Sequence, residues 1–220
     1  MNVFSEKLKY LLSFLLATVF FFSFGCKKKE DYNNYVYEYR SAIYCCSENE
    51  NLSAVYGYTY NETTQNRDYI LTFKLNEEDI INKTYSISFS FNDVEYCKDF
   101  TLNPVKNRLT LSFYVKDFNL DEFTVSVIVG SDIKTYTLTN AVPKDIKSLD
   151  EVLDALFDGE QSFMSSYYDE NGVFTAKLIC RIIMRDDYPY YYVGVIKDGR
   201  IKAFLLDGKT LSFLAIKDVY

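Results

Sequence analysis

The chain has 220 residues with 24 Lys and Arg, 31 Asp and Glu, no His and no Trp, giving a net charge of −7. The acidic balance excludes the basic surface that nucleic-acid binding needs, and the lack of His excludes imidazole as a catalytic base or metal ligand. At 48% hydrophobic and 25% charged residues, the composition is that of a folded protein rather than a disordered or collagen-like one.

The N-terminal segment has the parts of an export signal. Lys7 and Lys9 give it a positive start, and an apolar run covers residues 10–24. This run has the length of a signal-peptide core and is shorter than the about 20 residues of a membrane-spanning helix. It ends in Gly25 and Cys26, which three lysines follow.

These residues resemble a bacterial lipoprotein signal peptide, in which a lipobox ends in Gly or Ala and then Cys. Gly25 and Cys26 match that ending, whereas Ser23 and Phe24 stand where the family usually has Leu and a small residue. The resemblance implies that Cys26 is diacylated and becomes the first residue after cleavage. It implies a signal peptide over residues 1–25, a lipidated tether over 26–34 and a location on the extracytoplasmic face of the cell membrane.

Two alternatives to lipidation stay open for this segment. One is an uncleaved signal anchor, against which the positive charge of residues 27–29 counts under the positive-inside tendency. The other is an ordinary cleaved secretory signal.

Residues 1–29 hold five Lys and one Glu, so the rest of the chain holds 19 basic and 30 acidic residues, a charge of −11. We expect so acidic a body to stand off an anionic membrane, with only the lysines drawn to it.

Residues 35–141 alternate between apolar and polar side chains, which predicts short half-buried strands. The clearest case is residues 85–91, where Tyr85, Ile87, Phe89 and Phe91 share one face and serines occupy the other. About seven such strands separated by turn residues favour an antiparallel β-sandwich of Ig-like type. We expect them at residues 36–44, 54–60, 69–75, 84–91, 109–115, 123–129 and 133–138.

Residues 145–220 predict a second domain, made of a helix and a four-stranded antiparallel meander. Ser148 and Glu151 have the spacing of a capping box, and an apolar stripe follows at helical spacing up to Phe157, with Gly159 as an interruption. Strands are expected at residues 174–184, 190–196, 201–206 and 211–216. Lys197–Arg200 and Asp207–Gly208 are hairpin-turn signals. The whole chain is thus expected to be mostly β with an α+β part.

This second region resembles small helix-plus-sheet domains of Gram-positive surface lipoproteins and, more distantly, PepSY-like domains. The resemblance rests on residues 190–195, on Asp198 and Gly199, and on residues 205–210, after which the family usually has Gly-Glu where this chain has Leu211 and Ser212. PepSY-like domains are associated with regulating peptidases or with envelope tethering. The resemblance implies no catalytic residue.

Besides Cys26, the chain has four cysteines, Cys45, Cys46, Cys97 and Cys180. Structural thiols, at least one disulfide and a metal site are all open, although paired C-x-x-C spacing is missing. Cys180 lies in an apolar strand pattern and is expected to be buried, and Cys45 and Cys46 are expected on opposite faces of a strand.

Motifs that suggest catalysis have simpler interpretations. Gly208-Lys209-Thr210 resembles the end of a P-loop, but Ala203 stands where that motif needs Gly and a strand is predicted where it needs a helix. The acidic pairs at 169–170 and 186–187 fall in expected turns, where carboxylates are usually solvated, and they lack the register of a calcium loop. We therefore predict no catalytic residue, no metal ligand and no cofactor.

Tyr188, Tyr190, Tyr191 and Tyr192 form the most unusual cluster in the sequence. Tyrosines can stack on sugars or hold a peptide, because each ring is flat and apolar and carries a polar hydroxyl. The alternative is that they pack both faces of a strand.

The sequence thus favours a lipid-anchored, non-enzymatic module that binds a protein or a cell-surface ligand. An envelope module that regulates or inhibits a peptidase is the alternative, and a hydrolase based on carboxylates is the third.

Overall fold

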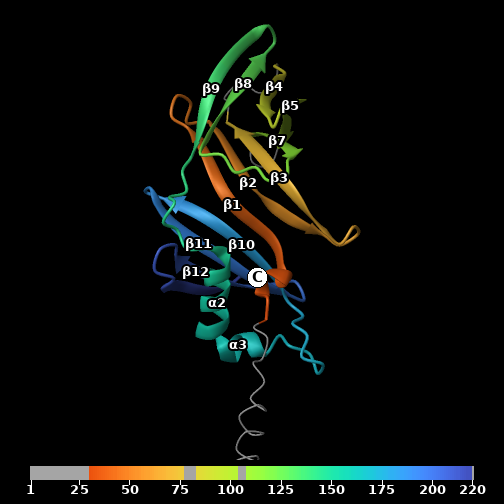
Figure 1. Cartoon of the computed structure of the whole chain (residues 1–220), viewed down its shortest axis with the longest axis vertical. Coiled ribbons are helices and arrows are strands. Elements are labelled where there is room, and N and C mark those ends of the chain that lie inside the picture. The colour runs from red at the N-terminus through yellow and green to blue at the C-terminus, as the bar shows by residue number, and fades with distance from the viewer. Residues whose placement is uncertain (1–29, 77–82, 104–107, 220) are drawn as a thin grey trace, which may run out of the picture. The chain divides into compact units, whose positions relative to one another are not determined.

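Paired β-strands dominate the architecture. The computed structural model describes residues 30–76, 83–103 and 108–219, and these form thirteen strands of one branched sheet, two α-helices and a 3-10 turn (Figure 1). The mostly β character predicted from the alternation is therefore confirmed. Residues 32–220 cluster as one compact unit.

The strands lie close to the positions that the alternation predicts. They are β1 (Val36–Cys46), β2 (Leu52–Asn61), β3 (Asn66–Leu75), β4 (Tyr85–Phe91), β5 (Val94–Asp99), β6 (Thr101–Asn103), β7 (Arg108–Tyr114), β8 (Glu122–Val129), β9 (Asp132–Asn140), β10 (Lys177–Arg185), β11 (Tyr188–Lys197), β12 (Arg200–Asp207) and β13 (Phe213–Val219). The turn η1 covers Tyr32–Tyr35, and the helices are α2 (Leu149–Gly159) and α3 (Gln161–Ser165).

The alternation does not predict β5 and β6, because their side chains are mostly exposed and carry no apolar stripe. A turn signal for β5 is nevertheless present. Asn92 and Asp93 both have positive φ and form the two-residue turn across which Phe91 pairs with Val94. Asn and Asp tolerate this left-handed backbone better than other non-glycine residues.

Strand β1 belongs to two groups of strands. One of its edges pairs with β2, and the other pairs first with β10 in parallel and then with β9 in antiparallel orientation. The register of β1 against β2 shifts between Arg40 and Ala42, as at a β-bulge. A bulge bends a strand, and here it lies where β1 passes from the β10 group to the β9 group.

The first hydrophobic core is enclosed by a nearly closed antiparallel sheet. Strands β1, β2, β3 and β7 form one side, strands β9, β8, β4 and β5 form the other, and β9 pairs with both β1 and β8. Aromatic rings fill the interior, among them Phe73, Phe89, Phe113, Phe118 and Phe123. Tyr85, Ile87 and Phe89 are buried and Phe91 packs against them, which confirms the face predicted for that strand.

The second core lies between α2 and one face of β10–β12. Ser148 and Glu151 make the predicted capping box, and the apolar stripe from Val152 to Phe157 packs on strand residues such as Cys180 and Phe204. The helix ends at Gly159, where the sequence predicts an interruption, and α3 follows.

Strands β10, β11, β12 and β13 pair antiparallel in chain order, but they do not form a separate sheet because β10 also pairs with β1. Asp198 and Gly199 form the predicted two-residue turn, both with positive φ. The turn after Asp207 is longer than a two-residue hairpin, and β13 begins at Phe213 rather than at residue 211. The reason is local, since the Asp207 carboxylate accepts hydrogen bonds from the backbone N–H groups of Lys209 and Thr210.

The four described cysteines are unpaired in this structure. Cys180 is fully buried in the second core, as expected, and burial raises the pKa of its thiol. Cys45 is exposed and Cys46 is buried, which confirms that they point to opposite faces. Cys26 lies outside the described residues, and so do the predicted signal peptide and the first part of the tether.

Candidate functional site

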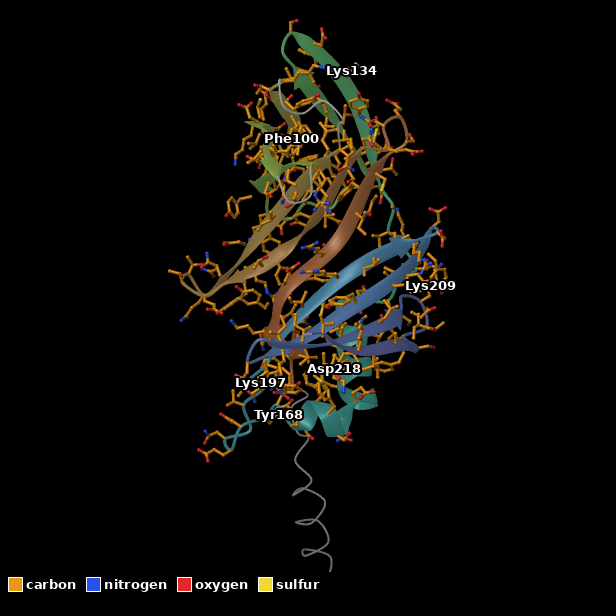
Figure 2. All side chains as sticks on the ribbon, turned by 180° about the vertical axis from the view of Figure 1, so that it is seen from behind. Phe100, Lys134, Tyr168, Lys197, Lys209 and Asp218 are labelled. Carbon is orange, nitrogen blue, oxygen red and sulfur yellow. The ribbon has the colours of Figure 1, made fainter. Side chains whose placement is uncertain are left out.

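The long sheet has one face that packs on the two cores and an opposite face, which we call the open sheet face. Figure 2 views the sheet from the side away from α2 and α3, and no described helix lies in front of it. Because partners in adjacent strands point to the same side, register defines a row of residues across this face. The row is Leu205, Tyr192, Arg181, Arg40, Gly57, Ile70 and Tyr114.

The tyrosine cluster is split between the two faces of β11. Tyr191 is 1% exposed, lies in the second core and donates a hydrogen bond from its hydroxyl to the Lys147 carbonyl at 2.7 Å. Burial, as the main cause, raises the pKa of Tyr191 to about 12. Its ring is thus packed inside the protein, which leaves Tyr188, Tyr190 and Tyr192 for the contact with a partner that the sequence suggests.

Tyr188, Tyr190 and Tyr192 are half-buried on the open sheet face. The Tyr188 hydroxyl donates to the Asp207 carboxylate at 3.0–3.1 Å, and the rings of Tyr188 and Tyr190 are tilted with centroids 5.3 Å apart. The Arg181 guanidinium lies 6.0 Å from the centre of the Tyr192 ring. Within the described residues the hydroxyls of Tyr190 and Tyr192 have no hydrogen-bond partner, so both can still donate to a ligand.

An ion-pair triad follows the tyrosines on this face. Glu38 accepts from Arg40 Nε at 2.7 Å and from Arg181 Nε and Nη2 at 2.9 and 3.0 Å. Burial acts to raise the pKa of the Glu38 carboxyl, but the hydrogen bonds and charges of the two arginines outweigh it and lower that pKa. Glu38 is therefore an ionised, fully engaged carboxylate with the features of a structural anchor rather than of a proton donor.

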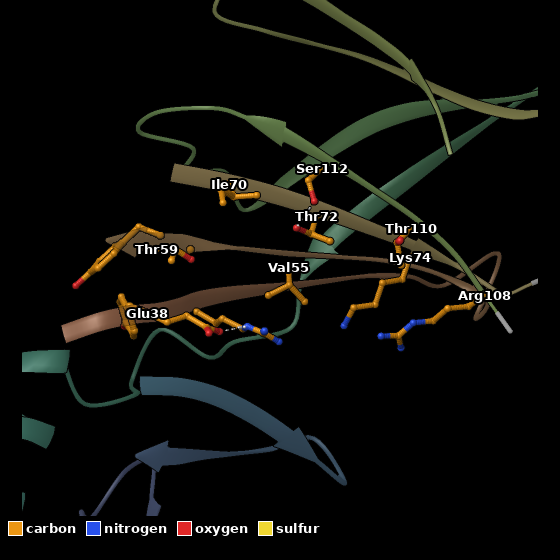
Figure 3. Close-up of a pocket in the computed structure, with 13 residues that line it drawn as sticks. Glu38, Val55, Thr59, Ile70, Thr72, Lys74, Arg108, Thr110 and Ser112 are labelled. Carbon is orange, nitrogen blue, oxygen red and sulfur yellow. Dashed lines mark hydrogen bonds and ion pairs between the residues drawn. The ribbon is translucent and has the colours of Figure 1, made fainter. Parts of the chain in front are cut away.

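A cavity of about 340 Å³ opens beside the triad, on the part of the face formed by β1, β2, β3 and β7 (Figure 3). This volume lies within the range of small-molecule sites, roughly 300–1,000 Å³. Polar and charged side chains make up most of its wall, together with two aliphatic ones, Val55 and Ile70. The charged residues are Glu38, Arg40, Lys74 and Arg108, and the hydroxyl residues are Thr59, Thr72, Thr110 and Ser112.

The other motifs considered in the sequence lie outside this cavity. Gly208–Thr210 belongs to the turn that leads into β13, and no helix follows it. Asp186 and Asp187 form the turn between β10 and β11. The Asp169 carboxylate accepts the backbone N–H groups of Val173 and Asn171, which lowers its pKa and stabilises its own loop. In the described part of the chain, no group of three or more Cys, Asp or Glu side chains is placed to hold a metal ion.

The charged residues of the open sheet face are absent from the sequence prediction. Glu38 and Arg40 alternate within β1, and Arg181 interrupts an otherwise apolar run in β10. Such charges in a strand signal a second, solvated face. The sequence does not show that β1 and β10 are neighbours, so it could not bring Glu38 and Arg181 together across 143 positions.

Comparison with known proteins gives no relative. No protein-family model matches the chain, and neither the curated proteins nor the solved structures give a match. Within the described residues, no helix is both long and apolar enough to cross a membrane. The open sheet face offers hydrogen-bond donors, cations and aromatic rings, which suit the binding of a ligand.

Proposed function

We propose that this chain is a lipid-anchored, extracytoplasmic binding module without catalytic activity, and that the open sheet face is its binding surface. The observation that carries the proposal is that Tyr190 and Tyr192 lie half-buried on a sheet face that no described helix covers, with Arg181 beside Tyr192 and the cavity beginning at β1, the next strand after β10. Aromatic and arginine side chains are the types that contribute most at binding surfaces. The anchor at Cys26 is supported by the lipobox-like residues Gly25 and Cys26.

The finer fold assignment belongs to the same proposal. An Ig-like sandwich over residues 35–141 and a separate helix-plus-meander domain over 145–220 are supported by the presence of two hydrophobic cores. Strands β1 and β2 carry side chains of both cores, so the two domains would share part of their sheet.

The binding surface can be tested by photo-crosslinking in the native membrane. A photoreactive phenylalanine analogue at position 190 should give a defined adduct, and Tyr192→Ser should reduce its yield. The matched control is the same analogue at Ile133, which is 65% exposed and lies in β9, outside the row that defines the open sheet face. Equal yield at both positions, or no adduct at 190, would contradict the proposal.

The anchor has its own test. Labelled palmitate should enter the wild-type chain, and Cys26→Ser should abolish the labelling, because Cys26 is the residue that would carry the acyl chains. Two acyl chains are enough for stable membrane anchoring. Cys97→Ser, at an exposed cysteine of β5, is the matched control and should label like the wild type. Unchanged labelling of the Cys26 variant would remove lipidation from the proposal.

A peptidase is the class of partner that the PepSY-like resemblance of residues 148–220 suggests. If the adduct at position 190 contains a peptidase, its activity should change when the purified chain is added. A Tyr190→Ser, Tyr192→Ser double variant should then lose that effect.

A further inference from the structure

The end of the cavity between β3 and β7 concentrates positive charge. Lys74 of β3 is the register partner of Thr110 in β7, and Arg108 stands two residues before Thr110. Residues two apart in a strand point to the same side, so Lys74, Thr110 and Arg108 face the cavity together. Figure 3 shows the Lys74 and Arg108 side chains reaching toward the same end of the cavity.

Arg108 has a buried donor without a partner. Its Nε atom is enclosed by the protein and makes no hydrogen bond with any described residue. A buried donor without a partner is unfavourable, so such groups are usually satisfied by protein, water or a ligand. Because the Nε atom is enclosed, the Arg108 side chain has to turn toward the cavity before an oxygen atom of a ligand can satisfy this donor.

Glu38 is the acidic residue among the described residues of the wall, and it makes no hydrogen bond with Arg108. Its two carboxylate oxygens already accept hydrogen bonds from Arg40 and Arg181 at the β1 end of the cavity. With Arg40, Lys74 and Arg108 against Glu38, the described wall residues carry a charge of +2. The chain beyond residue 29 carries −11. The positive cavity is thus a local exception on an acidic protein.

Hydroxyl groups line the floor between the two charged ends. Thr72 and Ser112 are register partners with their oxygens 2.9 Å apart, and Thr59 and Thr110 add further hydroxyls. A hydroxyl both donates and accepts, so this floor suits a ligand with hydroxyl groups of its own. Arg is the residue best shaped for a planar fork of hydrogen bonds to phosphate or carboxylate oxygens.

We propose that this cavity binds a phosphate ester of a small hydroxylated molecule, with the phosphate between Arg108 and Lys74 and the hydroxyl groups on Thr72 and Ser112. A tetrahedral phosphate offers enough acceptor oxygens for the guanidinium, the ammonium and Thr110 together. The inference deepens the proposed function, on which it rests, because it names a ligand class for one part of the open sheet face.

Calorimetric titration of the full chain in detergent tests the inference, with glycerol 3-phosphate as the probe. We expect saturable binding that weakens with added salt, because salt screens charge attraction. Arg108→Gln should bind at least about tenfold more weakly, since one charge-assisted hydrogen bond is worth about 1.5–3 kcal/mol and 1.4 kcal/mol is tenfold. The affinity of Arg108→Lys should lie between those of the wild type and Arg108→Gln, because Lys keeps the positive charge and loses the planar pair of hydrogen-bond donors.

Lys116→Gln is the matched control, because it removes a positive charge from an exposed loop residue outside the cavity. It should bind like the wild type, and the thermal midpoint of each variant checks that it folds. Equal binding by Arg108→Gln and Lys116→Gln, or no binding by the wild type, would overturn the inference.

Further probes separate the parts of the ligand. Inorganic phosphate should bind more weakly than glycerol 3-phosphate, and glycerol or acetate alone should not bind measurably. If inorganic phosphate binds as tightly as glycerol 3-phosphate, the proposed role of the hydroxyl groups is wrong. If acetate binds as tightly as glycerol 3-phosphate, the choice of phosphate is wrong. If phosphate binding fails while the adduct at position 190 persists, the proposed function stands and only this inference falls. If both fail, the open sheet face is not a binding surface.

Discussion

At the scale of single residues, Glu38 connects segments that are far apart in the chain. Its side chain is 18% exposed and accepts hydrogen bonds from Arg40 in its own strand and from Arg181 in β10. Because β1 and β10 meet only in the folded protein, this contact is lost on unfolding. The triad therefore contributes to stability in a way that depends on the charge of one carboxyl group.

Replacing Glu38 by Gln should lower the free energy of unfolding by about 1–2 kcal/mol at about pH 7, because it removes the negative charge that two partly buried guanidinium groups share and replaces one acceptor oxygen by an NH2 donor. The folded-state pKa of Glu38 lies below its ordinary value of 4.5. The stabilisation is thus present above about pH 4.5 and is lost as the pH falls through the lowered pKa.

Urea unfolding at several pH values measures this effect. The difference in the free energy of unfolding between the wild type and Glu38→Gln should become smaller toward acid pH, because a protonated Glu38 is as neutral as Gln. Glu48→Gln, at an exposed residue before β2, is the control and should change little. A difference that stays constant down to about pH 3 would contradict the assignment of the effect to the carboxylate.

At the scale of elements, the bulge in β1 depends on Gly57 in β2. Gly57 is the register partner of Arg40, next to the point where the pairing shifts. A Cβ atom at residue 57 would lie 1.9 Å from the Tyr39 carbonyl oxygen and 2.8 Å from the Arg40 Cα. These are backbone atoms of the neighbouring strand, so the clash could be relieved only by moving β1 itself.

Gly57→Ala should therefore cost about 3 kcal/mol or more of stability, at the upper end of what overpacking usually costs. Gly194→Ala in β11 is the matched control. A Cβ there would meet only side-chain atoms at 3.4 Å, which is near ordinary contact. Urea unfolding of both variants measures the difference, and equal stabilities would show that β1 adjusts freely around residue 57.

At the scale of the whole molecule, β1 and β2 connect the two cores. Val36 and Tyr58 belong to the second core, whereas Tyr44 and Ala54, on the same two strands, belong to the first. Loss of either core would remove the packing of both strands. Residues 32–220 are thus expected to unfold as one cooperative unit.

Two core truncations test this cooperativity. Leu71 lies in the first core and Leu206 in the second, and both are fully buried. Changing either to Ala should cost about 2–5 kcal/mol. Hydrogen exchange followed by mass spectrometry should show faster exchange through global unfolding in strands of both cores for each variant. If Leu71→Ala leaves the protection of β11 and β12 unchanged, the two proposed domains unfold independently and the expectation of one cooperative unit is wrong.

Local interactions account for what could be predicted from the sequence. The alternation of Tyr85, Ile87 and Phe89 predicts a strand because it follows from the geometry of one extended segment. The capping box of Ser148 and Glu151 and the turn at Asp198 and Gly199 likewise involve residues at most three positions apart. Strand β5 is missed because Tyr96 is its one partly buried side chain and the other five are exposed, so burial leaves no alternation in its sequence.

The sequence by itself determined the acidic charge, the β-rich class, the helix stripe and the lipobox-like ending at Cys26. Only the tertiary structure decided that Tyr191 is buried while Tyr190 and Tyr192 face outward, and that Arg181 meets Glu38. The same holds for Lys74 and Arg108, which come together through the pairing of β3 with β7. The physical reason is that strand order and register depend on contacts between distant segments, whereas periodicity in the sequence records only the burial of each segment.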